Sequence, residues 1–153
     1  MNPGEKPRVV LDTNVILNAL SRKLPYQSVL QDLISGKYEL CITTEILLEY
    51  EEKVAEFYSP STASLLLDAL TMSSHVYKKE VFFRFNLIPD LDDNKFVDCA
   101  FASNAHFLVS DDRVFRILKN LDFPKIEVLT LEEFMEVVEA IYRPLPTPLA
   151  AAR

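Results

Sequence analysis

The chain has 153 residues, of which 49% are hydrophobic and 25% charged, so it can bury the core of a single domain. Its formal net charge of −7 argues against a protein that coats nucleic acid through a large basic surface. No apolar stretch is as long as a membrane span or a signal-peptide core, so we expect a cytoplasmic protein without membrane contact.

The first half of the chain alternates short apolar runs with segments of helical spacing. A β-branched run predicts a buried strand over residues 8–11, and a helix follows over 14–19. The next predicted elements are a helix over 26–34, a strand over 39–42, a helix from Thr43 or Thr44 to about Tyr58, and a helix that begins at Ser59-Pro60. The last of these helices is rich in leucine and alanine between 65 and 70, and we expect it to be well buried.

The second half continues the alternation after an irregular stretch over 81–91. Asp90 or Asp92 can cap a helix over 93–104. A short strand over 75–78 precedes the irregular stretch. The elements after the helix are a strand over 106–110, a short helix ending at 119, a strand over 126–129 and a helix over 131–142. That last helix starts with the capping box Thr130-Leu-Glu-Glu133. We therefore predict one domain over 1–142 and a proline-rich tail over 143–153.

Strands alternating with helices indicate an α/β fold of three layers, in which a mainly parallel central sheet carries helices on both faces. The chain has only two glycines, which excludes the glycine-rich phosphate loops of nucleotide-binding proteins. In such a sheet, ligands bind beyond the carboxyl ends of the strands. The acidic residues that fall near this edge are therefore the candidate functional groups.

Several acids are placed to meet there. They are Asp12 after the first strand, Glu49 in the helix after the second strand, Asp93 at the start of its helix, and Asp111 and Asp112 after the strand over 106–110. Carboxylates that are packed together repel one another, and a divalent cation removes that cost. Ligands that are all oxygen select hard ions such as Mg²⁺ or Mn²⁺. The pattern thus predicts a metal site suited to hydrolysing a phosphodiester.

Each acid also has a purely structural interpretation. Asp12 can cap the first helix, Asp93 can complement a helix dipole, and Asp111 or Asp112 can cap the short helix that follows. Glu49 belongs to an acidic stripe at helical spacing, formed with Glu45, Glu52 and Glu56, and such a stripe normally faces solvent. The functional interpretation rests on the combination of the acids.

The order and spacing of these acids resemble a PIN-domain protein of the ribonuclease toxin type, over nearly the whole chain from about 8 to 142. The opening VVLDTNVILNAL is similar to the first motif of that family, and EILLEYEEKV is similar to its second. The stretch DLDDNKFVDCAFASNAHFLVSDD resembles its third and fourth motifs, with Asp93 seven residues before Ala100. Individually these motifs are short, whereas their order along a chain of this length is specific.

The resemblance implies a metal-dependent ribonuclease that uses Mg²⁺ or Mn²⁺. Its catalytic and metal-binding residues would be Asp12, Glu49, Asp93 and Asp112, with Asp111 and Asp98 as further possible ligands and Asn14 and Ser110 in support. RNA contacts would come from Lys95 and Arg113. A cognate antitoxin protein and a homodimer are the expected partners besides RNA.

Three other functions remain open at this point. A haloacid-dehalogenase-type phosphatase would need a second aspartate where Asn14 stands, and a receiver domain would need its acid pair near the first strand. A catalytically silent module of the same fold, working through partners, is the third. Phe82, Phe83 and Phe85 surround Arg84 and would stack on RNA bases, pack into the core, or mediate a dimer contact.

Overall fold

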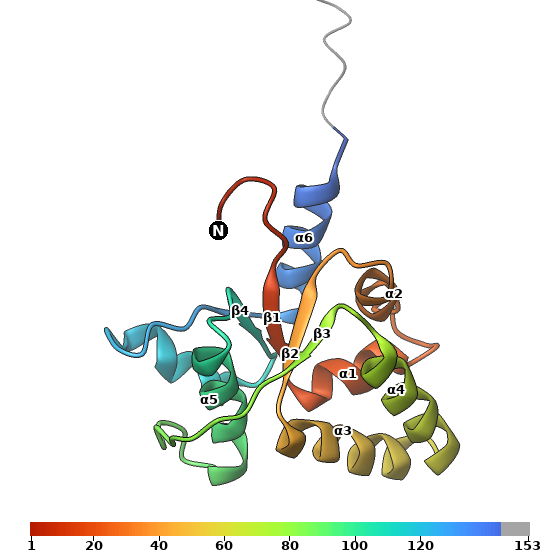
Figure 1. Cartoon of the computed structure of the whole chain (residues 1–153), viewed down its shortest axis with the longest axis horizontal. Helices are drawn as coiled ribbons and strands as arrows, with labels where there is room; N and C mark the ends of the chain where they lie inside the picture. The colour runs from red at the N-terminus through yellow and green to blue at the C-terminus, as the bar shows by residue number, and fades with distance from the viewer. Residues whose placement is uncertain (145–153) are drawn as a thin grey trace, which may run out of the picture.

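The computed structural model of the chain describes residues 1–144 and contains a five-stranded parallel sheet (Figure 1). The strands follow the order β3-β2-β1-β4-β5, so the first strand is central. Every neighbouring pair is parallel, and Leu11 of β1 lies opposite Val109 of β4. The strands are β1 (Arg8–Leu11), β2 (Glu39–Ile42), β3 (Val76–Lys78), β4 (Phe107–Val109) and β5 (Val128–Leu129).

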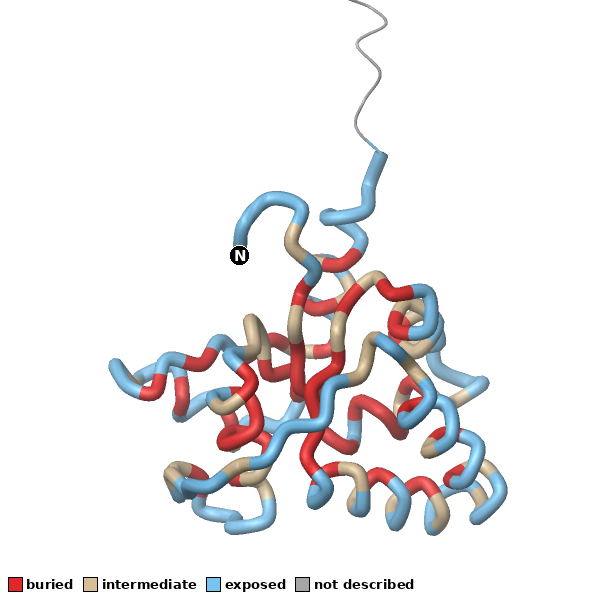
Figure 2. Tube along the Cα trace, in the orientation of Figure 1, coloured by how far each residue is buried: buried red, intermediate tan, exposed pale blue. Residues whose placement is uncertain are grey.

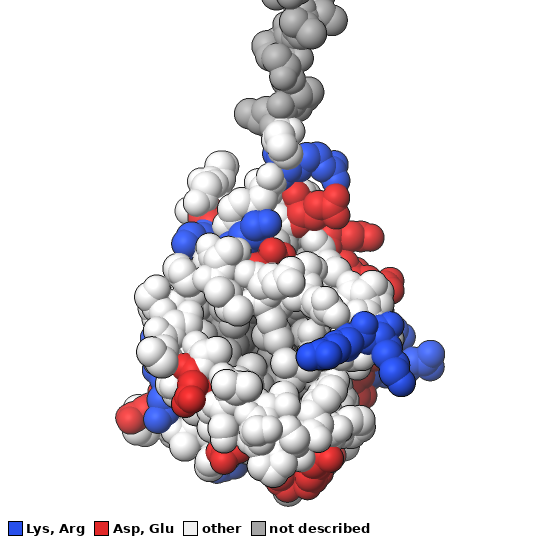
Figure 3. All heavy atoms as spheres, turned by 90° about the vertical axis from the view of Figure 1, so that its right-hand side faces the viewer, with Lys and Arg blue, Asp and Glu red and all other residues white. Residues whose placement is uncertain are grey.

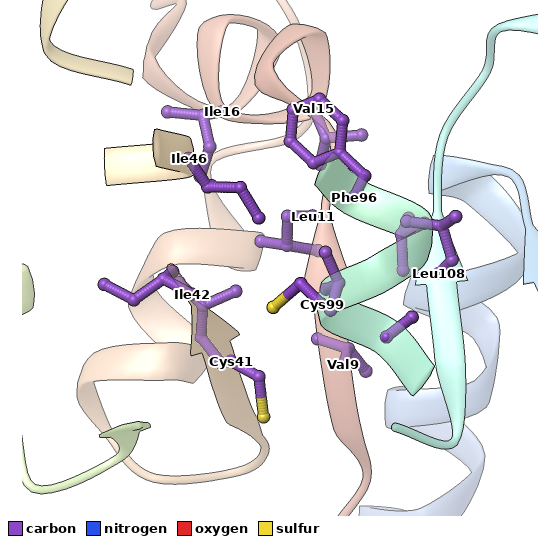
Figure 4. Packing of buried hydrophobic residues seen from close by; sticks show 14 of the residues in the cluster. Val9, Leu11, Val15, Ile16, Cys41, Ile42, Ile46, Phe96, Cys99 and Leu108 are labelled. Atoms are coloured by element: carbon purple, nitrogen blue, oxygen red, sulfur yellow. The ribbon is translucent and has the colours of Figure 1, made fainter. Parts of the chain in front are cut away.

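Helices cover both faces of this sheet, which confirms the predicted three-layer α/β class. Helix α5 packs against β1 and β4 on one face, and α6 lies behind the sheet beside β5 (Figures 1 and 4). The helices are α1 (Thr13–Leu20), α2 (Ser28–Ile34), α3 (Thr44–Phe57), α4 (Pro60–Met72), α5 (Asn94–Ala102) and α6 (Leu131–Tyr142). Two 3₁₀ helices complete the structure, η1 (Leu91–Asp93) and η2 (Arg113–Asn120).

The core forms around β1, whose residues Val9, Val10 and Leu11 are fully buried. Figure 2 shows that burial is concentrated along the central strands, and Figure 4 shows Phe96 and Cys99 of α5 packed over Leu11. A strand that is buried on both faces has a continuous apolar run, which is why RVVL and ELCI were sufficient to locate β1 and β2.

Three of the predicted helix caps are present, whereas Asp90 caps the 3₁₀ helix η1 instead of α5. The Thr43 hydroxyl accepts a hydrogen bond from the Ile46 amide, and the Ser59 hydroxyl accepts one from Thr62 ahead of Pro60. Thr130 and Glu133 form the expected capping box of α6. Each hydrogen bond satisfies an amide that the first helical turn leaves without a partner, so the local sequence fixes where these helices begin.

The prediction that α4 is well buried was wrong for part of the helix. Leu66 and Leu70 face the core, whereas Leu65 is 71% exposed and Ala69 is exposed too. Leu65 and Ala69 instead line an apolar surface groove with residues of α2, including Ile34. Figure 3 views the molecule from this side and shows a hollowed surface with few charged groups.

Two further expectations concern membranes and the tail. None of the helices within residues 1–144 is long and apolar enough to cross a membrane. Of the predicted proline-rich tail over 143–153, all but the first two residues lie outside the described part of the chain.

Candidate metal centre

The carboxyl ends of β1 and β4 place two acid-bearing segments at one edge of the sheet. Asp12 directly follows β1, and its amide donates to the Val109 carbonyl oxygen at 3.0 Å, which extends the pairing with β4 by one residue. Ser110 and Asp112 follow β4 at the same edge. Parallel pairing therefore brings together residues that are about one hundred positions apart in the sequence.

Asp12 is almost fully buried and is held by its neighbour across the sheet. Its Oδ2 accepts a hydrogen bond from the Ser110 hydroxyl at 2.7 Å, and that hydroxyl accepts one from the Asp112 amide at 3.0 Å. The Asp12 side chain makes no capping hydrogen bond to α1. Burial raises the pKa of Asp12, and the charges of Glu49 and Asp112 raise it further against the lowering effect of Ser110.

Glu49 differs from the other acids of the predicted stripe on α3 because its side chain turns inward. Its carboxylate accepts a hydrogen bond from the Thr13 hydroxyl, and its Oε1 lies 2.8 Å from the Lys95 ammonium. The Lys95 side chain is only 12% exposed. The other members, Glu45, Glu52 and Glu56, are exposed. Glu49 is therefore the one acid of the stripe that points toward the sheet edge.

Asp93 lies at the junction of η1 and α5, close enough to the other three acids for their charges to affect its pKa. Partial burial raises the pKa of Asp93 to about 6, and the charges of Asp90, Asp12, Asp112 and Glu49 contribute to the rise. Burial contributes most to this rise, and the contributions of the four charges require those carboxylates to lie near Asp93. The structure thus brings Asp12, Glu49, Asp93 and Asp112 into mutual electrostatic range.

The adjacent residues Asp111 and Asp112 point to different partners. Asp111 Oδ1 accepts a hydrogen bond from the Leu131 amide at 2.9 Å, which ties it to the start of α6. Asp112 Oδ1 accepts one from the Val114 amide at 3.0 Å and caps η2. Asp112, rather than Asp111, adds to the raised pKa of both Asp12 and Asp93.

The remaining candidates lie at the margin of the site or away from it. Asp98 is buried, its Oδ1 accepts a hydrogen bond from the Phe85 amide at 3.1 Å, and the charges that act on its pKa are those of Arg84 and Glu45. Asp98 therefore anchors the 79–90 segment and does not join the four acids. Asn14 and Arg113 are exposed, and Asn14 lines a shallow surface hollow with Asp111 and Asp112.

Sequence reasoning missed two polar residues that position the acids. Thr13 is buried and donates to Glu49, and its only signal was its place directly after Asp12. Asn94 is also buried, and its side-chain amide accepts from the Ile88 amide and donates to the Ile88 carbonyl oxygen, both at 2.9 Å. This pair of hydrogen bonds fixes the turn that carries Asp93.

The donor set has the chemistry of a hard-cation site. Its donors are carboxylate oxygens, with the hydroxyls of Thr13 and Ser110 beside them, and the repulsion among the acids is the kind that a divalent ion relieves. Across residues 1–144, no three His, Cys, Asp or Glu side chains stand close enough together to form a coordination shell. The carboxylates of Glu49 and Asp112 are instead directed at Lys95 and at a backbone amide.

A family model described as the PIN domain matches residues 8–114, which include all four acids. No curated protein sequence matches the chain significantly.

Solved structures show the same fold at low sequence identity. The VapBC2 structure from Rickettsia felis, bound to a DNA fragment from their promoter, has a TM-score of 0.55 and 18% identity over 80% of this chain and 98% of that chain. The PIN domain endonuclease Utp24 has a TM-score of 0.50 and 16% identity over 80% and 84% of the two chains. The RRP44 PIN domain of T. brucei has a TM-score of 0.50 and 12% identity over 88% and 82%.

Proposed function

The chain belongs to the PIN domain family, and from this premise we propose that it is a divalent-metal-dependent endoribonuclease that hydrolyses RNA phosphodiester bonds. The observation that carries the proposal is the shared edge of Asp12, Glu49, Asp93 and Asp112, where the pKa of Asp93 rises to about 6. A fold that is stabilised by few kilocalories per mole retains such repulsion mainly where function requires it.

The four acids would hold one or two Mg²⁺ or Mn²⁺ ions. A divalent ion bound there would supply charge neutralisation at the phosphate and a lower pKa for water. The neighbouring residues set the positions of the acids: Ser110 orients Asp12, Thr13 orients Glu49, and Asn94 fixes the turn before Asp93. Lys95 lies beside Glu49 and is placed to contact an RNA phosphate once its ion pair opens.

We also propose that the protein is the toxin of a toxin–antitoxin pair. The support is the likeness of its fold to the VapBC2 structure, together with the motif order along the chain. An antitoxin would have to cover the acidic edge. Co-purification with the product of a neighbouring gene, with loss of cleavage in the complex, is the expected result. Full cleavage activity in such a complex would argue against the pairing.

One observation favours a second function, a catalytically silent module that acts through partners. The Lys95 ammonium lies 2.8 Å from Glu49 and so neutralises one of the four acids without a metal. The phosphatase alternative has no comparable support, and we expect no turnover of phosphomonoesters.

Cleavage of mixed single-stranded RNA with Mn²⁺ tests the proposal. We expect wild type and Glu52→Gln to cleave, because Glu52 is exposed on α3 three residues beyond Glu49. Asp12→Asn and Glu49→Gln should lose activity by roughly 100-fold or more, in line with the loss of one electrostatic group from an active site. Equal cleavage by wild type and Asp12→Asn would reject the site. Absence of cleavage by all proteins on several substrates would favour the silent module.

A further inference from the structure

A short segment that begins within the edge strand β3 and continues toward helix α5 differs in composition from the rest of the chain. Residues 77–85, with the sequence YKKEVFFRF, hold three cations, one acid and four aromatic residues, in a protein whose net charge is −7. We call these residues the basic–aromatic segment. It leaves β3 and crosses toward α5, and it is exposed along most of its length (Figures 1 and 2). Interleaved basic and aromatic residues are typical of surfaces that bind single-stranded nucleic acid.

The basic–aromatic segment is fixed to the protein rather than loosely attached. The Phe85 amide donates to the buried Asp98 carboxylate at 3.1 Å. The Phe83 ring packs edge-on against Phe85 and Phe101, with ring centroids 5.0 and 5.5 Å apart. Two residues thus anchor the segment, and a ligand that binds to it would not have to order it first.

Two aromatic side chains of the segment, Tyr77 and Phe82, are left outside these contacts, and Phe82 is the more exposed of the two. Phe82 is 88% exposed, next to the packed Phe83. Phe82 also lines a surface cleft between the basic–aromatic segment and the start of α3, together with Lys79, Arg84 and Thr44. An exposed phenyl ring beside two cations matches the two parts of a nucleotide, its flat base and its phosphate.

The cleft reaches the candidate metal centre through Lys95. This lysine lines the cleft, and its ammonium lies 2.8 Å from Glu49. Arg84 is held near the cleft by Glu45 at 3.6 Å, an exposed ion pair that contributes little and is easily exchanged for a phosphate. A strand lying in the cleft would therefore enter the acidic edge at Glu49.

We propose that this cleft is a nucleotide subsite that holds an unpaired stretch of RNA beside the phosphate to be cut, with a base stacked on Phe82 and phosphates at Lys79 and Arg84. The bases must be unpaired because a duplex hides their faces in its own stack. The inference rests on the proposed function, since it assigns a substrate class to the same site.

Binding rather than cleavage tests the subsite separately. Fluorescence anisotropy with a labelled single-stranded RNA octamer and a hairpin duplex, both in EDTA, measures affinity without metal-dependent cutting. We expect Phe82→Ala to bind the single strand about 5- to 100-fold more weakly, the range for losing one base–aromatic stack. Phe82→Trp, which keeps an aromatic ring at this position, should bind the single strand about as tightly as wild type. Met72→Ala, which removes a side chain that is 85% exposed on α4, should bind like wild type.

The cations give a second readout. Lys79→Gln and Arg84→Gln should each lower the slope of log affinity against log salt by about one, as expected for one lost phosphate contact. A thermal unfolding midpoint equal to that of wild type shows that these exposed substitutions leave the fold intact.

Three results would overturn the subsite. The first is equal RNA binding by Phe82→Ala and wild type. The second is a preference of the wild-type protein for the duplex over the single strand. The third is a change from dimer to monomer in Phe82→Ala while RNA binding is unaffected, which would make the cleft a contact between copies of the chain. If binding depends on Phe82 but no RNA is cleaved with Mn²⁺, the subsite stands and the proposed activity fails. If RNA is cleaved and its binding does not depend on Phe82, the proposed activity is supported and the subsite is rejected.

Discussion

At the scale of single residues, two acids of the candidate centre, Asp12 and Glu49, are held in place by uncharged or cationic neighbours. Ser110 donates to Asp12 and Thr13 donates to Glu49, while Lys95 pairs with Glu49. Burial, and after it the charges of the neighbouring acids, still raise the pKa of Asp12 and of Asp93 above its usual value, so these contacts offset only part of the cost of the negative charges. This remaining cost is of the kind that a divalent cation would relieve.

This imbalance predicts an effect of pH on stability. The pKa of Asp93 is 3.8 in an unfolded chain and about 6 in the folded protein, so its contribution to stability is full below the lower value and is lost as pH rises through the higher one. In EDTA near neutral pH, Asp93→Asn should therefore unfold at higher urea than wild type. We expect a gain of about 1 kcal/mol after allowing for solvent screening, and little gain near pH 4.

Asp92→Asn is the matched control, because Asp92 lies in the same 3₁₀ turn and its side chain is 87% exposed. It should change stability little at either pH. If Asp93→Asn were less stable than wild type at neutral pH, the charged Asp93 carboxylate would not destabilise the folded protein.

At the scale of elements, the site depends on the parallel ends of β1 and β4 and on the residues directly after each strand. The chain after β4 divides its two adjacent acids between two helices: Asp111 contacts the start of α6, and Asp112 caps η2 beside the other acids. Neighbouring side chains in extended backbone point in opposite directions, so only one of the pair can face the centre.

This division predicts that the two acids differ in effect. Asp111→Ala should lower the free energy of unfolding by about 1 kcal/mol, because it removes an acceptor from the first turn of α6, and should leave metal binding intact. Thr130→Ala, which removes a cap from the same helix end, should act in the same way. Asp112→Asn should keep the fold, since asparagine also caps, and should lose metal binding. Loss of metal binding in Asp111→Ala alone would reverse the assignment.

Much of the element pattern could be predicted from sequence because local chemistry determines it. Apolar runs located β1 and β2, and Ser59 and Thr130 marked the starts of α4 and α6. The burial of α4 could not be predicted in the same way. Three consecutive leucines span about 200° of a helix, and only the packing of neighbouring elements decides that Leu66 faces inward and Leu65 outward.

The candidate site was predictable in its acids but not in their partners. The order of Asp12, Glu49, Asp93 and Asp112 is visible along the chain. The contact of Asp98 with Phe85 depends on the path of an irregular segment, for which sequence offers no periodic signal. Asp98 therefore lies apart from the four acids, as does Asp111, which contacts the start of α6.

At the scale of the whole molecule, three surfaces differ in character. The acidic edge lies beyond the ends of β1 and β4, and the cleft of the basic–aromatic segment reaches it through Lys95. The groove between α2 and α4 is apolar and carries few charges (Figure 3). Substrate and antitoxin would both meet the acidic edge, whereas the groove would suit an apolar contact with another protein surface. The expected homodimer and antitoxin stay predictions.

If the four acids form one divalent-metal site, Mn²⁺ binding followed by electron paramagnetic resonance should depend on each of them. Wild type and the exposed-acid control Glu52→Gln should bind Mn²⁺ with equal affinity. Asp12→Asn and Asp93→Asn should bind it at least about 10-fold more weakly, since each removes a direct ligand. Binding of Mn²⁺ by Asp12→Asn as tight as that of wild type would show that Asp12 is not a ligand and that the four acids do not form one metal site.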